Sequence, residues 1–475
     1  MHEFLVSTAA FVVLVGVMVI VHEFGHFALA KLFRVRVEAF SFGFGPRLFG
    51  FKSGETDYKV CLLPLGGYVK MTGETPDQIS GSTPGTPVIG QIAERLSGQE
   101  ALPEAPEGDP GSFTTHPRWQ RIIIGLAGPG ANFILAFVLM IFYYGFINEV
   151  PAVEVPSTTV EWITPDSAAA AAGFQPGDII TRFENANNPD WEKIYERAKL
   201  NANQTVPVTV DRAGATLNLN LTVPASAKND DFDVSNAGLQ PQYMPGPIGV
   251  QEVAPGTPAD HAGLRAGDAI QAVDGHNFHS VSTLLAYMQA GQGKPLALSV
   301  LRNGASVQLV AQPAKLDPTG WKLGFVAVMP PFRQNPLPLA QAASKATGFC
   351  ADNSFLIVEV LQRIFTHKIA VSQLAGPVGI ARMAGDAAEM NGWLPKFGLA
   401  GEISLNLGIL NLMPFPILDG GLILLLLIES VLRRDISINV KERIYQAAFV
   451  VLVAFFAFII FNDVTKLPIF THLKP

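Results

Sequence analysis

Two histidines and a glutamate near the start of the chain form the pattern best suited to chemistry. The stretch His22-Glu23-Phe24-Gly25-His26 places two imidazoles four residues apart. On a helix, side chains at i and i+4 project from one face, so both rings can reach one zinc ion at about 2.0–2.1 Å. Glu23 lies beside them and can take a proton from water that the metal acidifies. The pattern predicts a zinc hydrolase centre with His22 and His26 as ligands and Glu23 as general base.

The apolar surroundings of this motif indicate that its polar residues have a functional role. Phe4–Val21 carries no charged residue and runs directly into the motif. A charge at the centre of a membrane span costs about 2.5–3.5 kcal/mol on insertion scales, so ionisable residues that persist there usually have a function. The alternative is a helix end at the interface, with its polar residues facing water.

A third ligand is expected because catalytic zinc usually has three protein ligands and a water. Asp419 is the only acidic residue in the apolar stretch Ile403–Ile428. Pro414 and Pro416 break the helical pattern just before it. Non-helical backbone at membrane depth is tolerated only where it is buried in protein or lines a wet cavity. We therefore expect the break to face the active site, with Asp419 on the zinc; a capping role for Asp419 at the helix that follows is compatible with ligation.

Two asparagines of the same stretch, Asn406 and Asn411, are also polar in an apolar span. An asparagine side chain supplies both a donor and an acceptor to a substrate backbone in a dry site. The alternative is hydrogen bonding between helices. Substrate contact is the favoured interpretation.

Four stretches are long and apolar enough to cross a bilayer, which takes about 20 residues per helix. They are Phe4–Leu32, Ile122–Ile147, Ile403–Ile428 and Ile444–Asn462. The chain of 475 residues is 49% hydrophobic and 15% charged, against about 25% charged residues in soluble domains. This composition excludes a wholly soluble protein. The net charge of −7 excludes a basic nucleic-acid surface.

Positive residues near these spans predict their orientation. Lys and Arg follow the first span, precede the second and lie between the third and fourth, and they are scarce at both ends of the chain. Positive loops stay in the cytoplasm. We therefore expect both termini, and the long segment between the second and third spans, outside the cytoplasm. The first stretch is too long for a signal peptide and lacks a basic start, so we expect it to stay attached.

The region between the first two spans does not have a helical pattern. Tyr58–Leu62 and Tyr68–Met71 are typical of strands, and Gly43–Pro46 predicts a turn. Small apolar β-hairpins at the membrane are expected. Residues 72–112 are rich in Gly, Pro, Ser, Thr and acids, which predicts a disordered linker. A spacer is favoured over a binding tail.

An internal repeat occupies the middle of the chain. Ser167–Ile180 reads SAAAAAGFQPGDII and Thr257–Ile270 reads TPADHAGLRAGDAI, 90 residues later. Each copy continues with a strand, a turn, a helix (Trp191–Leu200; Val281–Met288), further strands and a glycine-containing extended segment. The two copies predict two domains of one fold. His276 and His279 of the second copy lie in a turn after Asp274-Gly275 and are expected to have no carboxylate partner, which favours a surface turn over a metal site.

The repeat resembles tandem PDZ domains in the permuted order, with the ligand-binding strand last. Such a groove binds an extended peptide by adding it to a sheet edge. The resemblance implies that the loops at Gly238-Leu239 and Gly324-Phe325 hold a peptide carboxylate. The alternative is that these loops are only turns.

Together, HEFGH, the stretch Asn411–Gly421 (NLMPFPILDGG) and the repeat between them resemble the site-2 protease family of intramembrane zinc metalloproteases. Pro64–Met71, Ala127–Asn132 and Leu374–Ala381 also match this family. The resemblance implies one zinc ion per chain on His22, His26 and Asp419, with Glu23 as base. It further implies a substrate channel bordered by Asn406, Asn411, Pro414 and Pro416, and a substrate strand held at Gly67 and Tyr68. The acidic linker is longer than the family pattern leads us to expect.

We therefore predict a polytopic α-helical membrane protein with four transmembrane helices, membrane-associated β-hairpins and two extracytoplasmic PDZ-like α+β domains. The expected parts are residues 1–36 (first span), 37–71 (hairpins), 72–117 (cytoplasmic linker), 118–149 (second span), 150–243 and 244–332 (PDZ-like domains), 333–398 (amphipathic interfacial helices), 399–430 (third span), 431–443 (cytoplasmic loop) and 444–475 (fourth span and tail).

The resemblance implies a bacterial inner-membrane location and membrane-protein substrates, such as anti-sigma factors or signal-peptide remnants. Another protease would trim a substrate first, and the PDZ pair would exclude bulky ones. The lipid bilayer and a peptide ligand of the PDZ domains are the other expected partners, and no nucleic acid is. The competing hypothesis is a catalytically silent membrane scaffold, which need not hold stoichiometric zinc. A transporter lacks support because the spans show no paired inverted repeats.

Overall fold

The computed structural model describes residues 2–73, 109–151, 158–224, 234–317, 320–328, 332–366 and 376–465. The chain divides into two compact units, Met1–Glu149 with Gln334–Pro475, and Val150–Arg333. The first unit contains the predicted spans and hairpin region, and the second contains both repeats. Most of the predicted linker, residues 74–108, lies outside the described residues.

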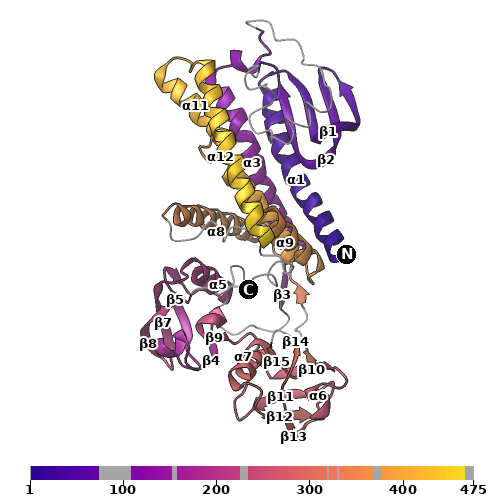
Figure 1. The fold of residues 1–475 in the computed structure, drawn as a ribbon, viewed down its shortest axis with the longest axis vertical. Coiled ribbons are helices and arrows are strands. Elements are labelled where there is room, and N and C mark those ends of the chain that lie inside the picture. Colours follow the sequence, from indigo (N-terminus) through magenta and orange to yellow (C-terminus); the bar gives the residue numbers. More distant parts are fainter. Residues whose placement is uncertain are drawn as a thin grey trace. The chain divides into compact units, whose positions relative to one another are not determined.

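The first unit is built on helices that pack around α3. α3 (Arg118–Phe142) continues into a π-helical turn, Tyr143–Ile147, and contacts α1, α8, α10 and α11. Figure 1 shows α1 and α3 running alongside each other. The remaining helices of this unit are α1 (His2–Leu32), α8 (Leu339–Phe365), α9 (Pro377–Glu389), α10 (Leu394–Asn411), α11 (Asp419–Leu432) and α12 (Ile438–Thr465).

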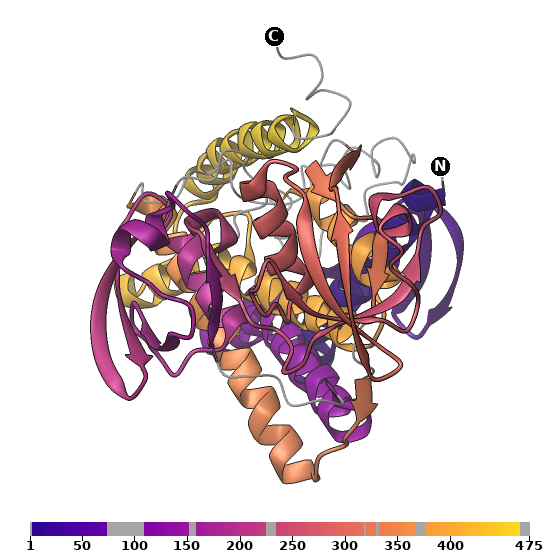
Figure 2. The same cartoon turned by 90° about the horizontal axis from the view of Figure 1, so that it is seen from below.

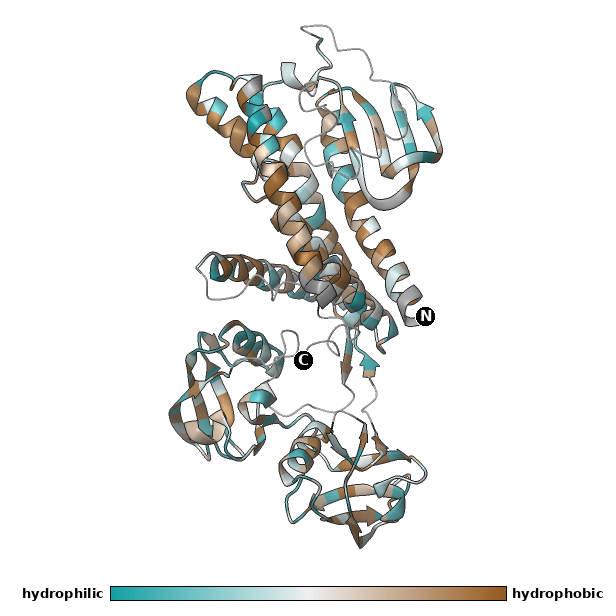
Figure 3. Ribbon diagram, in the orientation of Figure 1, coloured by the Kyte–Doolittle hydropathy of each residue, from teal (hydrophilic) through white to brown (hydrophobic). Residues whose placement is uncertain are grey.

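Three helices among the described residues are long and apolar enough to cross a membrane: Val6–Leu32, Arg118–Ile147 and Arg443–Phe461. They coincide with the first, second and fourth predicted spans, and Figure 3 shows their predominantly hydrophobic residues. Side chains of the last helix, such as Val450 and Phe461, are exposed, as lipid-facing residues are. These helices support the prediction of a membrane protein.

The third predicted span consists of two shorter helices. α10 ends at Asn411 and α11 begins at Asp419, with non-helical backbone between them. The predicted break at the two prolines is therefore present. Neither helix meets the length and hydropathy of a full span by itself, so the count of four transmembrane helices stays a prediction.

The hairpin region is one folded two-stranded sheet of β1 (Val37–Ser53) and β2 (Thr56–Met71). The expected turn at Gly43–Pro46 is confirmed. Residues 39–42 run in the same direction as 57–60, whereas 49–52 run opposite to 57–60, so the chain reverses between 42 and 49, where Gly43 and Gly45 adopt positive φ. Residues 39–42 have Cα partners at 67–70 and also at 57–60. They therefore lie between two stretches of β2, which places the stretch ending at Met71 along one side of the sheet.

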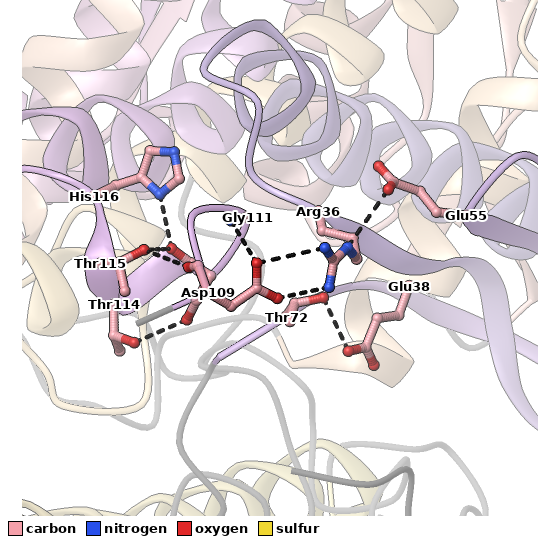
Figure 4. Close-up of polar contacts among 10 residues, drawn as sticks. Arg36, Glu38, Glu55, Thr72, Asp109, Gly111, Thr114, Thr115 and His116 are labelled. Atoms are coloured by element: carbon pink, nitrogen blue, oxygen red, sulfur yellow. Dashed lines mark hydrogen bonds and ion pairs between the residues drawn. The ribbon is translucent and has the colours of Figure 1, made fainter. Parts of the chain in front are cut away.

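A polar cluster joins the start of β1 to both sides of the linker (Figure 4). Arg36 donates to the Asp109 carboxylate at 2.7 Å, and Thr72 donates to Glu38 at 3.0 Å. The Gly111 backbone N–H and the Arg36 guanidinium hold the pKa of Asp109 below its usual range. Backbone bonds between Thr72 and Arg36 and between Phe113 and Thr72 complete the junction. Residues 72 and 109 are thus anchored close together at the end of α1.

The first repeat consists of two small sheets and short helices packed around one hydrophobic core. Its sheets have the orders β6-β5-β7-β8 and β4-β9, and its core contains Phe183, Ile194, Val208 and Leu239. Its elements are β4 (Val160–Ile163), α4 (Ala168–Ala172), β5 (Ile179–Phe183), β6 (Ala186–Asn187), α5 (Trp191–Leu200), β7 (Thr205–Arg212), β8 (Ala215–Thr222) and β9 (Leu239–Pro241). The chain passes between the units at β3 (Glu149–Pro151) and β17 (Phe332–Gln334).

The second repeat has the same core order of elements, without a counterpart of β6 and with the extra strands β14 and β15. Its main sheet is β13-β12-β11-β10-β16, and its core contains Val273, Leu284, Leu298 and Leu323. Figure 2 shows the sheets of the two repeats as separate lobes. The elements are β10 (Ile248–Val253), α6 (Pro258–His261), β11 (Ala269–Val273), α7 (Val281–Gly291), β12 (Leu296–Arg302), β13 (Ala305–Ala311), β14 (Ala314–Asp317), β15 (Gly320–Lys322) and β16 (Phe325–Ala327).

One ion pair occurs at the same place in both repeats. Arg212 donates from Nε and Nη2 to both oxygens of Asp178 at 2.7 and 2.8 Å. Arg302 binds Asp268 in the same way at 2.8 and 2.7 Å. The hydrogen bonds from Arg302 hold the pKa of Asp268 below its usual range. The repeat predicted from the sequence is therefore also a repeat of the fold, because equivalent residues make the same contact to a buried aspartate in both copies.

His279 has a carboxylate partner that the sequence did not suggest. Glu161 of the first repeat accepts a bond from the His279 ring at 2.9 Å and one from the Ser280 backbone N–H at 3.2 Å. The two residues are 118 positions apart. His279 thus lies at a contact between the repeats and not in a plain surface turn.

Candidate metal centre

The predicted zinc ligands converge from two helices. His22 and His26 lie one turn apart on α1, and Asp419 is the first residue of α11. Asp419 occupies that position because the chain is extended at Leu418 and turns helical directly after it. A Cβ on Gly421 would lie 2.1 Å from the Phe415 carbonyl oxygen. Glycine is therefore required where the start of α11 packs against the break.

The three donor atoms have the mutual spacing of a tetrahedral zinc site. His22 Nε2 and His26 Nε2 lie 3.1 and 3.5 Å from Asp419 Oδ2, and 3.3 Å from each other. Two ligands at about 2.0–2.1 Å from one tetrahedral ion are separated by about 3.3–3.4 Å. All three residues are buried. Two imidazole nitrogens and a carboxylate oxygen also match the donor preference of zinc, so these residues fit the ion.

Glu23, which follows His22 on α1, lies against the hairpin sheet as well as beside the histidines. Its carboxylate hydrogen-bonds with the Val69 backbone N–H. A Cβ on Gly67 would lie 3.2 Å from Glu23 Cγ. The carboxylate is therefore held beside the 67–71 stretch of β2, next to the histidines that flank it in sequence. The contact of Glu23, the predicted general base, with Val69 was not predicted from the sequence.

α3 provides the surroundings of both imidazoles. His26 Nδ1 lies 2.8 Å from the Ile124 carbonyl oxygen, and His22 Nδ1 lies 3.1 Å from Asn132 Nδ2. Between them, a Cβ on Gly128 would lie 2.2 Å from His26 Nε2. From the sequence, residues 127–132 were predicted only to match a family pattern, with no role at the metal centre. An asparagine in an otherwise apolar span was the available signal for a role at the site.

The structure describes the positions of the asparagines and prolines predicted to contact substrate. Among the described residues, no hydrogen bond or ion pair joins any of them to the donor atoms of His22, His26 or Asp419. Asn406 lies within α10 and Asn411 ends it, both half-buried. Pro414 is exposed and Pro416 half-buried in the break between α10 and α11. Their roles stay predictions.

Gly67 and Tyr68 occupy different environments. Gly67 lies against Glu23, whereas the Tyr68 ring is buried against Phe44 at a centroid distance of 6.1 Å, with Lys59 over its face. A contact of Tyr68 with a substrate would therefore involve its backbone.

The predicted peptide loops occupy equivalent positions in the two repeats. Gly238 has φ +91° and Gly324 has φ +85°, and each directly precedes the last strand, which begins at Leu239 or Phe325. The Gly238 carbonyl accepts from Thr164 N–H at 2.9 Å, and the Gly324 carbonyl from Ala254 N–H at 3.0 Å. Peptide binding at these loops stays a prediction.

A buried group of two histidines and an aspartate that could hold a metal ion, with one helix long and apolar enough to cross a membrane and a further carboxylate beside it, is typical of membrane metalloproteases. Residues 10–455 match peptidase family M50, and the chain belongs to this family. It is a metalloprotease of the site-2 type.

Curated relatives match the chain over nearly its whole length. It is 33% identical to the regulator of sigma-E protease RseP of Escherichia coli (strain K12) and to the protein of that name of Salmonella typhimurium (strain 14028s). It is 30% identical to a putative zinc metalloprotease of Vibrio cholerae. Each comparison covers 98% of this chain and 100% of the relative.

Among solved structures, the PDZ domain of the SdrC-like protein from Listeria innocua matches 18% of this chain and 94% of its own, at 21% identity and a TM-score of 0.17. The PDZ assignment of the two repeats stays a prediction.

Proposed function

We propose that this metalloprotease cleaves peptide bonds within the membrane-spanning segments of single-span membrane proteins. In this proposal His22, His26 and Asp419 hold one zinc ion and Glu23 is the general base. The observation that supports it is the separation of three buried donor atoms by 3.1, 3.3 and 3.5 Å. That spacing suits a tetrahedral zinc ion with one position left for water or substrate.

The residues around the centre have distinct tasks in this mechanism. When bound, zinc supplies a Lewis acid that polarises a peptide carbonyl and acidifies water. Glu23 takes a proton from the attacking water and passes it to the leaving nitrogen. The Val69 N–H orients the Glu23 carboxylate for both transfers.

A helical substrate hides its carbonyls in hydrogen bonds from i+4 to i, so it must unwind locally before attack. Residues 67–71 of β2 pair with β1 on one side. We propose that the substrate strand pairs with their other side, at Gly67 and Tyr68. Gly67 supports this because it lies against Glu23. Asn406 and Asn411, with Pro414 and Pro416, would border the channel.

The two repeats fit a size filter outside the cytoplasm of a bacterial inner membrane. We propose that they exclude substrates that keep a bulky extracytoplasmic domain, and that the loops at Gly238 and Gly324 bind peptide carboxylates. The relatives named as regulators of sigma-E protease support a role in regulated intramembrane proteolysis during stress, with anti-sigma factor-like substrates. Positive loops on the opposite side support this orientation.

The test replaces the general base and leaves the ligands intact. Glu23→Gln should keep one zinc per chain and the melting temperature of the wild type. It should slow cleavage of a single-span reporter by about 10²–10⁴-fold, the usual contribution of general acid–base catalysis. Glu252→Gln, an exposed carboxylate in the second repeat, is the control and should cleave normally. A Glu23→Gln protein that cleaves at the wild-type rate would contradict the mechanism, and a wild type without stoichiometric zinc would favour a silent scaffold.

A further inference from the structure

Three positions on one face of α3 lie against the histidine pair. Ile124, Gly128 and Asn132 are spaced at i, i+4 and i+8, so they form one stripe along the helix. Ile124 offers its carbonyl to His26 Nδ1 at 2.8 Å. Gly128 leaves room for both rings. Asn132 lies opposite His22, and its role is not explained by the reaction described above.

The Asn132 side chain is fully buried and has one atom without a partner. Its Nδ2 lies 3.1 Å from His22 Nδ1, while its Oδ1 is buried and makes no hydrogen bond. An unsatisfied buried acceptor costs about 1–3 kcal/mol. The cost of burying the Asn132 amide in an apolar span therefore indicates that this side chain has a function.

The chemistry of the two ring nitrogens indicates what that function is. A neutral imidazole carries its proton on one nitrogen and a lone pair on the other, and the partner of the first decides which nitrogen is free. If Nδ2 donates to His22 Nδ1, the ring proton lies on Nε2, where it points at Asp419 Oδ2. If the amide turns by half a rotation, Oδ1 accepts from Nδ1–H and the Nε2 lone pair becomes free for a metal.

We propose that Asn132 is a positioning residue of the metal centre, whose side-chain oxygen accepts from His22 Nδ1–H when zinc is bound and so fixes the ring with Nε2 towards the ion. Ile124 does the same for His26 through its carbonyl. An amide suits this position because it can serve His22 as a donor without the metal and as an acceptor with it. The inference rests on the proposed zinc site.

The experiment measures zinc affinity of the full-length protein in detergent, by competition with a chelator of known affinity. Asn132→Leu keeps the approximate size but removes the acceptor, and should weaken zinc binding about 10–100-fold, as loss of an outer partner of a metal-binding histidine does. Asn132→Ala should show the same loss, and replaces the leucine variant if that one does not fold. Asn132→Asp retains an acceptor oxygen and should bind zinc at least as tightly as the wild type.

A matched control separates this role from packing. Ser404 of α10 donates to the Asn132 backbone carbonyl at 2.8 Å and does not involve its side chain. Ser404→Ala should therefore leave zinc affinity within about twofold. Cobalt substituted for zinc provides a second readout, since the visible absorption of a tetrahedral site should change in Asn132→Leu and Asn132→Ala but not in Ser404→Ala.

The outcomes distinguish this inference from the proposed function. Wild-type zinc affinity in Asn132→Leu and Asn132→Ala overturns the inference alone. An affinity in Asn132→Asp as weak as in the leucine variant, or in Ser404→Ala as weak as in either, also overturns it. A wild-type protein that binds no stoichiometric zinc overturns the zinc site itself.

Discussion

Adding one methyl group to Gly128 should abolish metal binding. The Cβ of an alanine there would lie 2.2 Å from His26 Nε2 and 2.8 Å from His22 Nε2, between two of the proposed ligand atoms. To restore an ordinary contact of about 3.4 Å, the His26 ring must move by about 1 Å, whereas metal–ligand distances tolerate only about 0.2 Å. The two helices pack closely here, since a Cβ on Gly25 of α1 would lie 2.2 Å from the Ala127 carbonyl oxygen of α3, so moving them apart would lose this packing.

We expect Gly128→Ala to lose more than about 1.4 kcal/mol of zinc affinity, a tenfold rise in Kd, near the low end of the 1–3 kcal/mol typical of overpacking. At free zinc well below the wild-type Kd, the variant should then hold less than about a tenth of the wild-type zinc. Cleavage of a single-span reporter should fall in proportion. The assay is metal analysis of the purified full-length protein, followed by reporter cleavage in membranes.

Gly130→Ala is the matched control because it makes the same change on the same helix, two residues away. A Cβ at Gly130 meets nothing within 4 Å. This variant should hold full zinc and gain up to about 1 kcal/mol from the better helix propensity of alanine. Full zinc in both variants would refute the reasoning, since it would mean that α3 does not approach the imidazoles as closely as the structure has it.

Two further predictions follow from ionic contacts. Chelation of zinc should lower the melting temperature of the wild type, because a ligand at 100 times its Kd stabilises the folded state by about 2.7 kcal/mol. Added zinc should restore the original melting temperature. Asp419→Ala should melt at the same temperature with or without chelator. Arg302→Met should destabilise the second repeat by about 3 kcal/mol at pH 7, because it leaves the buried Asp268 carboxylate unpaired. The pKa of Asp268 is held low by Arg302, so the wild type has this stabilisation above the ordinary pKa of aspartate and loses it as the pH falls through the lowered pKa. Near-UV circular dichroism measures the melting temperatures of variant and wild type. The difference between them should be smaller at pH 3 than at pH 7. An equal difference at both pH values would show that the ion pair is not its cause.

Much of the architecture could be predicted because it depends on local patterns. Long apolar runs predicted α1, α3 and α12, and the helix Trp191–Leu200 agrees with its predicted bounds. Pro414 and Pro416 predicted the break before α11, since a proline cannot continue a helix. The hairpin region was less predictable: Gly43 and Gly45 correctly predict a turn, but no local pattern predicts that residues 39–42 lie between two stretches of β2.

The sequence by itself predicted the ligands of the proposed centre and determined the repeat of the second unit. The spacing of His22 and His26 puts both on one helix face, and Asp419 was the only acid available in its span. Only the tertiary structure decided what surrounds them: that Asn132 faces His22, that Gly67 and Val69 lie beside Glu23, and that Glu161 reaches His279. The reason is physical. Helical periodicity and hydrophobicity act between neighbours in the chain, whereas these contacts depend on which faces of separate elements pack together, and no local pattern specifies that choice.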